Sequence, residues 1–278
     1  MTYKTVSLAI VVEGENDADS AIFWASGLAE RRQAHLSVGI GVPPIVIPVD
    51  GASVGMMATY EEENVTLRKQ AENLAERIRN DALRAGVSAS LAIDSQAYRP
   101  FSTELVRLAR LSDICVVAAP ARTSAAKSDA VLDILMTSGA PLLIAPATWR
   151  KRGPATNAIV AWDESAGAAR AIRGALPLLV EAQKVEIVCV TGEKLLPSAT
   201  PGADLARYLA RHCRSVAETE IPLQGGDAAA TLRQHASLTR ADLLVLGAYG
   251  HSRFREFVLG GVTRSMLQDI TVPTLMAH

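Results

Sequence analysis

The feature of this sequence that most constrains its fold is an internal repeat with a period of about half the chain. Ser112–Ala121 can be overlaid on Ala241–Gly250, and Gly139–Pro146 can be overlaid on Thr271–His278. Both pairs are apolar, strand-like runs, and they occur in the same order in the two halves. A repeat of this length indicates two domains built on one plan. The chain has 278 residues, which is comfortable for two α/β domains.

Short apolar runs alternate with amphipathic runs of helical period throughout each half. In the first half we expect strands at 5–12, 35–42, 87–93, 113–118 and 141–145, and helices at 17–32, 59–85, 101–111 and 128–137. In the second half we expect strands at 157–162, 185–190, 215–221, 242–246 and 272–276, and helices at 165–180, 202–211, 227–238 and from 264 onward. This order predicts an α/β fold of two duplicated, doubly wound, Rossmann-like domains, each a mainly parallel five-stranded sheet flanked by helices.

The segment Thr148–Pro154 interrupts the repeat with charge, glycine and proline, which marks a domain boundary. We therefore expect one domain at 1–148 and a second at 155–278. The basic triplet Arg150–Arg152 is interpreted as a solvated linker rather than a nucleic-acid patch. The apolar loop Pro43–Gly55 is expected to pack against another part of the protein, and covering a ligand is the alternative.

Composition excludes several classes of function. The net charge is -1 and aromatic residues make up 4%, which argues against a nucleic-acid binder or an anionic-membrane binder. No apolar run is long enough for a transmembrane helix, and the apolar N-terminus is expected to be a first strand rather than a signal peptide. Cys115, Cys189 and Cys213 suit neither a disulfide framework nor a zinc site, so we expect a reduced, cytoplasmic protein.

The stretch from Gly247 to Thr263 is the strongest candidate for a binding site. It follows a strand-like run, precedes a helix-like run, and contains four glycines at 247, 250, 260 and 261. Glycine permits positive φ and close approach to the main chain, and the first N–H groups of a helix attract anions. The stretch therefore predicts a phosphate-binding loop. The alternative is that the glycines only end a strand and cap a helix.

Further candidates belong to the same edge of the predicted sheet, because the carboxyl ends of parallel strands form the ligand crevice. Asp163 ends the first strand of the second half and is a candidate for hydrogen bonds to a ribose or base, or for capping the next helix. Trp162 is expected to line a base pocket or to belong to the core. Loop residues that are expected either to reach phosphate oxygens or to remain solvated are His251, Ser252, Arg253 and Arg255.

The overlay of the two halves fails where binding is expected. Gly247 and Gly250 align with Ala118 and Ala121, so the first half lacks that glycine turn. In the same overlay, the pair at 260–261 falls on Ser128–Asp129, which puts a negative charge where a phosphate would lie. A carboxylate, Glu13, remains at the Asp163 position. A phosphorylated ligand is therefore predicted for the second half alone.

The glycine spacing fits neither of two common nucleotide motifs. There is no GxxxxGK[ST] sequence, and the glycines follow a fourth strand rather than a first. The chain resembles instead a tandem universal stress protein, whose ATP-binding members carry G-x2-G-x9-G-[ST] after the fourth strand. Here Gly247-x2-Gly250-x9-Gly260 matches that spacing, and Gly261 departs from it.

The resemblance implies an adenine nucleotide alpha hydrolase-like fold and a set of nucleotide-binding positions. Carried over by position, these are Ala161, Trp162, Asp163, Val190, Leu246, Gly247, Gly250, Gly260, Gly261, Val262 and Thr263, with His251 as a further candidate. The expected ligand is ATP, ADP or AMP, with Mg²⁺ as a further option. Gly261 lacks the hydroxyl with which the family motif contacts the terminal phosphate. Either Thr263 supplies that contact instead, or the binding preference shifts toward AMP or ADP.

The expected function is that of an adenine-nucleotide-binding stress or regulatory protein. The rivals are a slow ATPase and a scaffold that binds no nucleotide; no catalytic residue or metal ligand is assigned. In the resembled family, fifth strands pair across a two-fold axis. The runs after Pro141 and Pro273 are expected to pair in that way within one chain, as an internal pseudo-dimer, and a homodimer stays open.

Overall fold

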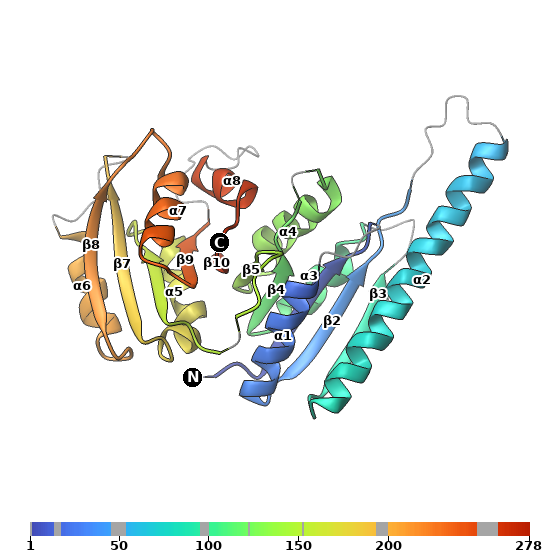
Figure 1. The fold of residues 1–278 in the computed structure, drawn as a ribbon, viewed down its shortest axis with the longest axis horizontal. Coiled ribbons are helices and arrows are strands. Elements are labelled where there is room, and N and C mark those ends of the chain that lie inside the picture. The colour runs from blue at the N-terminus through green and yellow to red at the C-terminus, as the bar shows by residue number, and fades with distance from the viewer. Residues whose placement is uncertain are drawn as a thin grey trace.

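The structure is a computed structural model, which describes residues 2–13, 18–45, 54–94, 100–121, 123–151, 153–192, 200–248 and 261–278. For 54–58 it describes the backbone only. Figure 1 shows two α/β halves that lie side by side and meet near the middle of the molecule. Strands and helices alternate along both halves, as the hydrophobic periodicity predicts.

The elements of each half follow the expected order. The first half contains β1 (Thr5–Val11), α1 (Asp19–Arg32), β2 (His35–Gly41), α2 (Val54–Arg84), β3 (Ala89–Asp94), α3 (Thr103–Arg110), β4 (Ile114–Ala118), α4 (Ala125–Thr137) and β5 (Leu142–Ala145). The second contains β6 (Asn157–Ala161), α5 (Ala166–Leu179), β7 (Lys184–Thr191), α6 (Pro201–Leu209), β8 (Val216–Pro222), α7 (Ala228–Leu238), β9 (Leu243–Gly247), α8 (Gly261–Gln268) and β10 (Thr274–Ala277).

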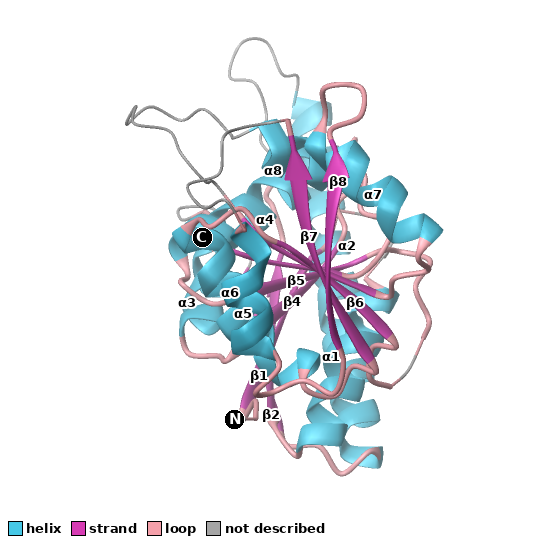
Figure 2. Cartoon of the chain, turned by 90° about the vertical axis from the view of Figure 1, so that its left-hand side faces the viewer, coloured by secondary structure: helices cyan, strands magenta, loops and turns pink. Residues whose placement is uncertain are grey.

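All ten strands form one sheet, in the order β3-β2-β1-β4-β5-β10-β9-β6-β7-β8. Neighbouring strands within each half are parallel, and the halves join where β5 pairs antiparallel with β10. Leu143 lies opposite Leu275 in this pair, and both side chains are fully buried. The predicted pairing of the fifth strands is therefore confirmed. Figure 2 shows the strands fanning about one another, the usual twist of such a sheet.

Helices cover both faces of the sheet. The side chains of α1, α2, α5 and α6 pack into one hydrophobic cluster, and those of α3, α4, α7 and α8 pack into the other. Equivalent helices of the two halves thus lie on the same face. This arrangement, with strands such as β1 and β9 buried on both sides, is what a parallel sheet requires.

A pair of aspartates repeats the same contact in the two halves. Asp113, just before β4, accepts hydrogen bonds from the backbone N–H groups of Lys4 (2.6 Å) and Thr5 (2.9 Å). Asp242, just before β9, accepts them from Thr156 (2.8 Å) and Asn157 (3.0 Å). Each carboxylate therefore ties the start of a fourth strand to the start of a first strand, in support of the overlay.

The linker between the halves differs in one respect from its interpretation as a solvated segment. Lys151 forms an ion pair with Asp242, whose side chain is buried, and also donates to the Thr156 hydroxyl at 2.9 Å. Arg150 donates to the carbonyl groups of Ala147 and Trp149. Lys151 is held in this ion pair because the buried carboxylate of Asp242 needs a cation to offset its desolvation.

The two halves also make side-chain contacts beside the β5–β10 pair. The Tyr3 hydroxyl donates to the Gly174 carbonyl of α5 at 2.6 Å. Arg32 donates to the Pro177 carbonyl at 2.7 Å and forms an ion pair with Glu181 at 3.0 Å. These contacts join α1 and the start of β1 to α5, which fixes one half against the other.

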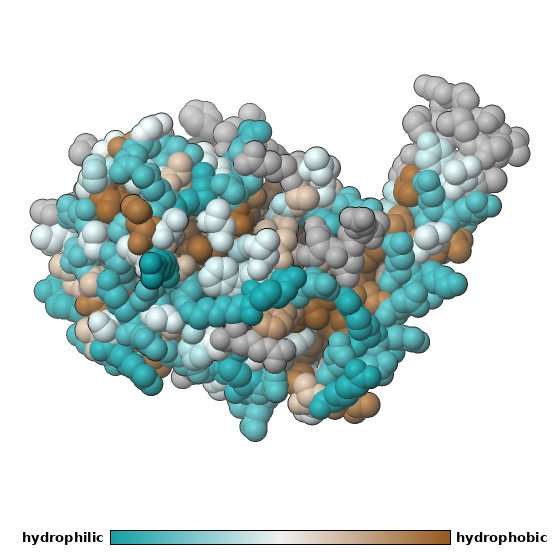
Figure 3. All heavy atoms as spheres, in the orientation of Figure 1, coloured by the Kyte–Doolittle hydropathy of each residue, from teal (hydrophilic) through white to brown (hydrophobic). Residues whose placement is uncertain are grey.

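The long helix α2 begins five residues before its expected start and extends past the edge of the sheet (Figure 1). Its inward side buries Leu67, Ala71 and Ile78. In Figure 3, brown spheres gather between α1 and α2, whereas teal spheres cover most of the outer side of α2. Of the apolar loop 43–55, Ile45 packs against the core and pairs its backbone N–H with the Asn64 side chain at 3.0 Å. Residues 46–53 lie outside the described residues.

A buried carboxylate on β7 makes folding sensitive to acid. Glu186 accepts hydrogen bonds from Thr219 (2.7 Å), His235 (3.2 Å) and Lys184 (3.4 Å). Burial pushes the pKa of Glu186 up, but these three partners outweigh burial and hold the pKa below its usual range. A lowered folded-state pKa stabilises the protein above the unfolded pKa of about 4.3, and this contribution is lost as pH falls through the folded value.

We expect Glu186→Gln to lower the free energy of unfolding by about 1–3 kcal/mol at pH 7, because three polar partners lose a carboxylate. The difference from the natural protein should shrink as the pH falls below about 4. Urea unfolding at several pH values measures both effects. Glu220→Gln, at an exposed position on neighbouring β8, is the matched control. A pH-independent difference would contradict the assigned role of the Glu186 charge.

Candidate functional site

The sheet topology creates a crevice at a defined place in each half. In the second half the chain runs from β6 outward to β7 and β8, and then returns to β9 on the other side of β6. The order therefore reverses between β6 and β9, and in open α/β sheets ligands bind at the carboxyl ends of strands at such a point. The predicted residues 161–163 and 246–247 follow or end these two strands.

The end of β6 presents two successive side chains to opposite faces. Ala161 packs against the cluster under α7 and α8, whereas Trp162 packs against the cluster under α5 and α6. The Trp162 ring is half-buried, and its Nε1–H donates to the Pro201 carbonyl at the start of α6, at 2.7 Å. Trp162 thus packs against the core, which is one of the two roles expected for it from the sequence. Val190 of β7 packs on the same face as Ala161.

Asp163 shapes the turn between β6 and α5. Its Oδ1 accepts a hydrogen bond from the Ser165 N–H at 3.0 Å. Ser165 is the N-cap of α5, and its hydroxyl accepts from the Ala168 N–H at 3.0 Å. Between them, Glu164 adopts a left-handed backbone conformation with φ of 59°, which is costly for a non-glycine residue. Asp163 is half-buried at the crevice, so its role in the turn is compatible with ligand contact.

Gly247 has a packing role that the sequence does not reveal. A Cβ at this position would lie 2.3 Å from the Ala168 nitrogen and 2.7 Å from the Gly167 carbonyl carbon. A Cβ on Gly167 would in turn lie 2.9 Å from the Ala248 oxygen. The end of β9 and the first turn of α5 therefore pack backbone against backbone. Leu246, one residue earlier, is buried in the core.

The residues predicted to offer anion-binding N–H groups include the first described turn of α8. Gly261 begins this helix and is exposed, and a Cβ on it would meet nothing within 4 Å. Val262 packs partly against the core, and Thr263 is only 2% exposed. The first N–H groups of a helix lack partners inside that helix, so this turn can donate to an anion. The predicted residues Gly250, His251 and Gly260 lie outside the described residues.

Asp227, the N-cap of α7, and Arg233 of α7 hold α8 in place. Asp227 accepts a hydrogen bond from the Ser265 hydroxyl at 2.7 Å, and Arg233 donates to the Ser265 carbonyl at 2.9 Å. Burial raises the pKa of Asp227, but Ser265, two backbone N–H groups and the Arg233 charge bring it below its usual range. Sequence reasoning found Asp227 only as the start of a helix, because its partner lies 38 residues away.

The β6–β8 side of the crevice is acidic. Burial, with the nearby carboxylates of Glu218, Glu220, Glu164 and Asp163, raises the pKa of the Cys189 thiol to about 11. Cys189 therefore stays protonated at neutral pH and is not a candidate nucleophile. Carboxylates can accept hydrogen bonds from hydroxyl groups but repel phosphates. The charge distribution thus suits sugar hydroxyls on this side and phosphates on the α8 side.

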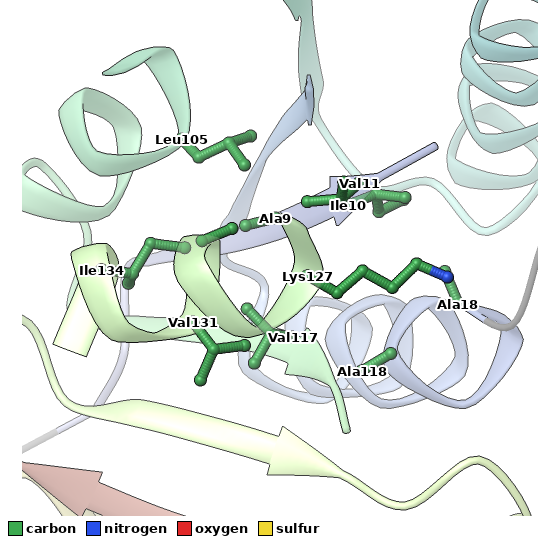
Figure 4. A pocket seen from close by; sticks show the side chains of 11 residues that line it. Ala9, Ile10, Val11, Ala18, Leu105, Val117, Ala118, Lys127, Val131 and Ile134 are labelled. Carbon is green, nitrogen blue, oxygen red and sulfur yellow. The ribbon is translucent and has the colours of Figure 1, made fainter. Parts of the chain in front are cut away.

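The equivalent crevice of the first half, between the ends of β1 and β4, is nearly closed. Its cavity is about 20 Å³, which is room for about one water molecule. Figure 4 shows Val117, Val131 and Ile134 around this cavity, with Lys127 reaching from α4 toward Ala18. Side chains thus occupy the space that a ligand would need.

The predicted overlay of Gly261 on Asp129 agrees with the structure. Both residues lie the same number of positions before the proline that precedes the fifth strand, Pro273 or Pro141. At the same offset, the buried side chains of Val131 and Ile134 in α4 correspond to those of Thr263 and Met266 in α8. A further negative charge lies at the N-terminus of α4: the Glu13 carboxylate accepts a hydrogen bond from Ser124, the N-cap of that helix. The first half thus places its own carboxylate where an anion would bind.

The described part of the chain offers no group of three or more His, Cys, Asp or Glu side chains arranged to hold a metal ion. Within the same residues, no helix combines the length and apolar character needed to cross a membrane. The candidate site therefore consists of the β6 and β9 ends and the first turn of α8.

Comparison with known proteins gives one family match, over part of the chain, and several similar solved structures. Residues 155–278 match the Universal stress protein family. No curated protein matches the chain in sequence. A universal stress protein from Archaeoglobus fulgidus has a similar structure, at 13% identity and a TM-score of 0.66, over 98% of this chain and 97% of that one. A functionally unknown protein from Pseudomonas aeruginosa is similar over 97% and 91%, at 14% identity and a TM-score of 0.56. The whole chain therefore has a fold found in solved structures.

Proposed function

We propose that this chain is a tandem universal-stress-type protein that binds one adenine nucleotide, in the crevice of its second half. The proposal rests on one observation: the glycine motif starts and β6 ends at the same place, where the strand order reverses between β6 and β9. The spacing Gly247-x2-Gly250-x9-Gly260 leads directly into α8, whose first residue is exposed. The β6 end, with Asp163, lies across the same crevice.

In the proposed complex the phosphates lie against the N-terminus of α8, where N–H groups and the helix dipole favour an anion. Asp163 accepts hydrogen bonds from the ribose, and Ala161 and Val190 contact the base. Trp162 supports the base pocket from behind through its bond to Pro201. Mg²⁺ would accompany the phosphates, held by them and by water. The first half serves as a structural partner, because its crevice is closed and carries Glu13.

The exposed position of Gly261 leads to a test of ligand preference. We expect Gly261→Ser to raise ATP affinity about two- to tenfold, because one added hydroxyl donor contributes about 0.5–1.5 kcal/mol. AMP affinity should change little, since AMP lacks the terminal phosphates. Calorimetric titration with ATP, ADP and AMP measures this. Asp129→Ser, at the position of α4 that overlays Gly261, is the matched control. Equal gains for AMP and ATP would contradict the assignment of position 261 to a terminal phosphate.

Slow ATP hydrolysis is the second candidate function, and it is tested separately from binding. It would appear as phosphate release that Asp163→Ala abolishes while the fold is retained. Absence of both nucleotide binding and hydrolysis would favour a scaffold function, with the stress-type fold retained for its packing alone.

A further inference from the structure

A second cavity lies between the two halves, beside the first turn of α8. Helices α4 and α8 cover the same face of the sheet, on either side of the β5–β10 pair (Figure 1). Between them is a groove with a volume of about 440 Å³. This volume is within the range of roughly 300–1,000 Å³ that is common for small-molecule sites. The groove uses residues of both halves, so it exists only in the paired arrangement.

The walls of the groove are apolar. Val131 and Leu132 of α4 face Leu267 of α8 across it. Val131 is buried, and the two leucines are half-buried, so a ligand would cover apolar surface that is now partly exposed. Among the described lining residues there is no aromatic ring to stack on a base and no carboxylate to hold a ribose. The groove therefore does not suit a nucleotide.

The described lining of the groove has one positively charged side chain, that of Arg264. Arg264 is exposed, and within the described residues its guanidinium has neither an ion pair nor a hydrogen bond. It is the only charged residue among the described lining residues. Ser128 donates its hydroxyl hydrogen to the Ser124 carbonyl at 2.8 Å, and Gln268 is neutral, so Arg264 is the lining side chain whose charge matches an anion. A guanidinium pairs with a carboxylate through two parallel hydrogen bonds.

We propose that the groove between α4 and α8 binds a small molecule with an apolar chain and a single carboxylate, such as a medium-chain acyl carboxylate. Its carboxylate pairs with Arg264, and its chain lies between Leu132 and Leu267. A single negative charge matches the single cation. This site adjoins the nucleotide crevice at the first turn of α8, and one ligand in it would contact both halves.

Titration of the full chain with sodium decanoate, followed by calorimetry, tests this proposal. We expect saturable binding of one decanoate per chain. Arg264→Gln should weaken binding about tenfold or more, since a charge-assisted pair is lost. Decanol, which has the same chain length without the charge, should bind the natural protein as weakly as decanoate binds that variant. Leu132→Asn should also weaken decanoate binding, and Arg214→Gln, an exposed arginine outside the groove, should leave it unchanged.

The outcome that overturns the proposal is equal affinity of the natural protein and Arg264→Gln for decanoate, or no saturable binding at about millimolar concentration. Thermal unfolding of each variant confirms that the fold is retained. Leu132 belongs to the first half, so Leu132→Asn should leave ATP affinity unchanged. Loss of ATP binding with decanoate binding intact would therefore count against the proposed function alone.

Discussion

Replacement of Gly247 with alanine is expected to destabilise the protein by about 3 kcal/mol or more, the largest stability effect that the structure predicts for a single methyl group. The added Cβ would lie 2.3 Å from the Ala168 nitrogen, and backbone atoms of α5 cannot move aside as a side chain can. Relief of the overlap requires β9 and α5 to separate, and both are buried around this point. Urea or thermal unfolding measures the loss.

Gly261→Ala is the matched control for this substitution. It adds the same methyl group to another glycine of the same motif, where nothing lies within 4 Å. Because alanine favours helix over glycine by up to about 1 kcal/mol, this variant should be neutral or slightly stabilised. Equal destabilisation of the two variants would contradict the packing role of Gly247.

Gly250→Val is expected to have the largest effect on ligand binding, a loss of ATP affinity of about a hundredfold or more. A branched side chain both opposes positive φ and blocks close approach of a phosphate to the main chain. Calorimetric titration with ATP gives the affinity, and thermal unfolding without ligand separates loss of binding from loss of fold.

The first half offers a matched control, because Ala121 is the counterpart of Gly250 in the overlay of the repeats. Ala121 is exposed, so Ala121→Val should leave both stability and ATP affinity nearly unchanged. If Gly250→Val retains full affinity, the glycine turn is not the phosphate cradle. If both variants lose affinity, binding is not confined to the second half.

The fold was accessible from the sequence because its signals are local and repeated. Most strands are apolar runs, the helices have apolar residues at helical spacing, and the repeat shows which elements are equivalent. The β5–β10 pair was also predictable, since the mainly apolar runs after Pro141 and Pro273 would otherwise form an exposed edge. The start of α2 was missed because the apolar loop before it carries no clear helix-start signal.

The candidate site was accessible only in part. Spacing along the chain located the residues at the strand ends, but the contacts that explain them join distant segments. The backbone contact of Gly247 with α5, and the hydrogen bond from Ser265 to Asp227, have no sequence signature. The hydrogen bond from Ser124, the N-cap of α4, to Glu13 joins residues 111 positions apart and has no sequence signature either.

The central claim is that the second half binds an adenine nucleotide and the first half does not. Calorimetric titration of the full chain with ATP in the presence of Mg²⁺ tests it most directly, because the titration gives the number of sites per chain. The account predicts one site per chain. Two sites per chain, or no binding at about millimolar ATP, would contradict it.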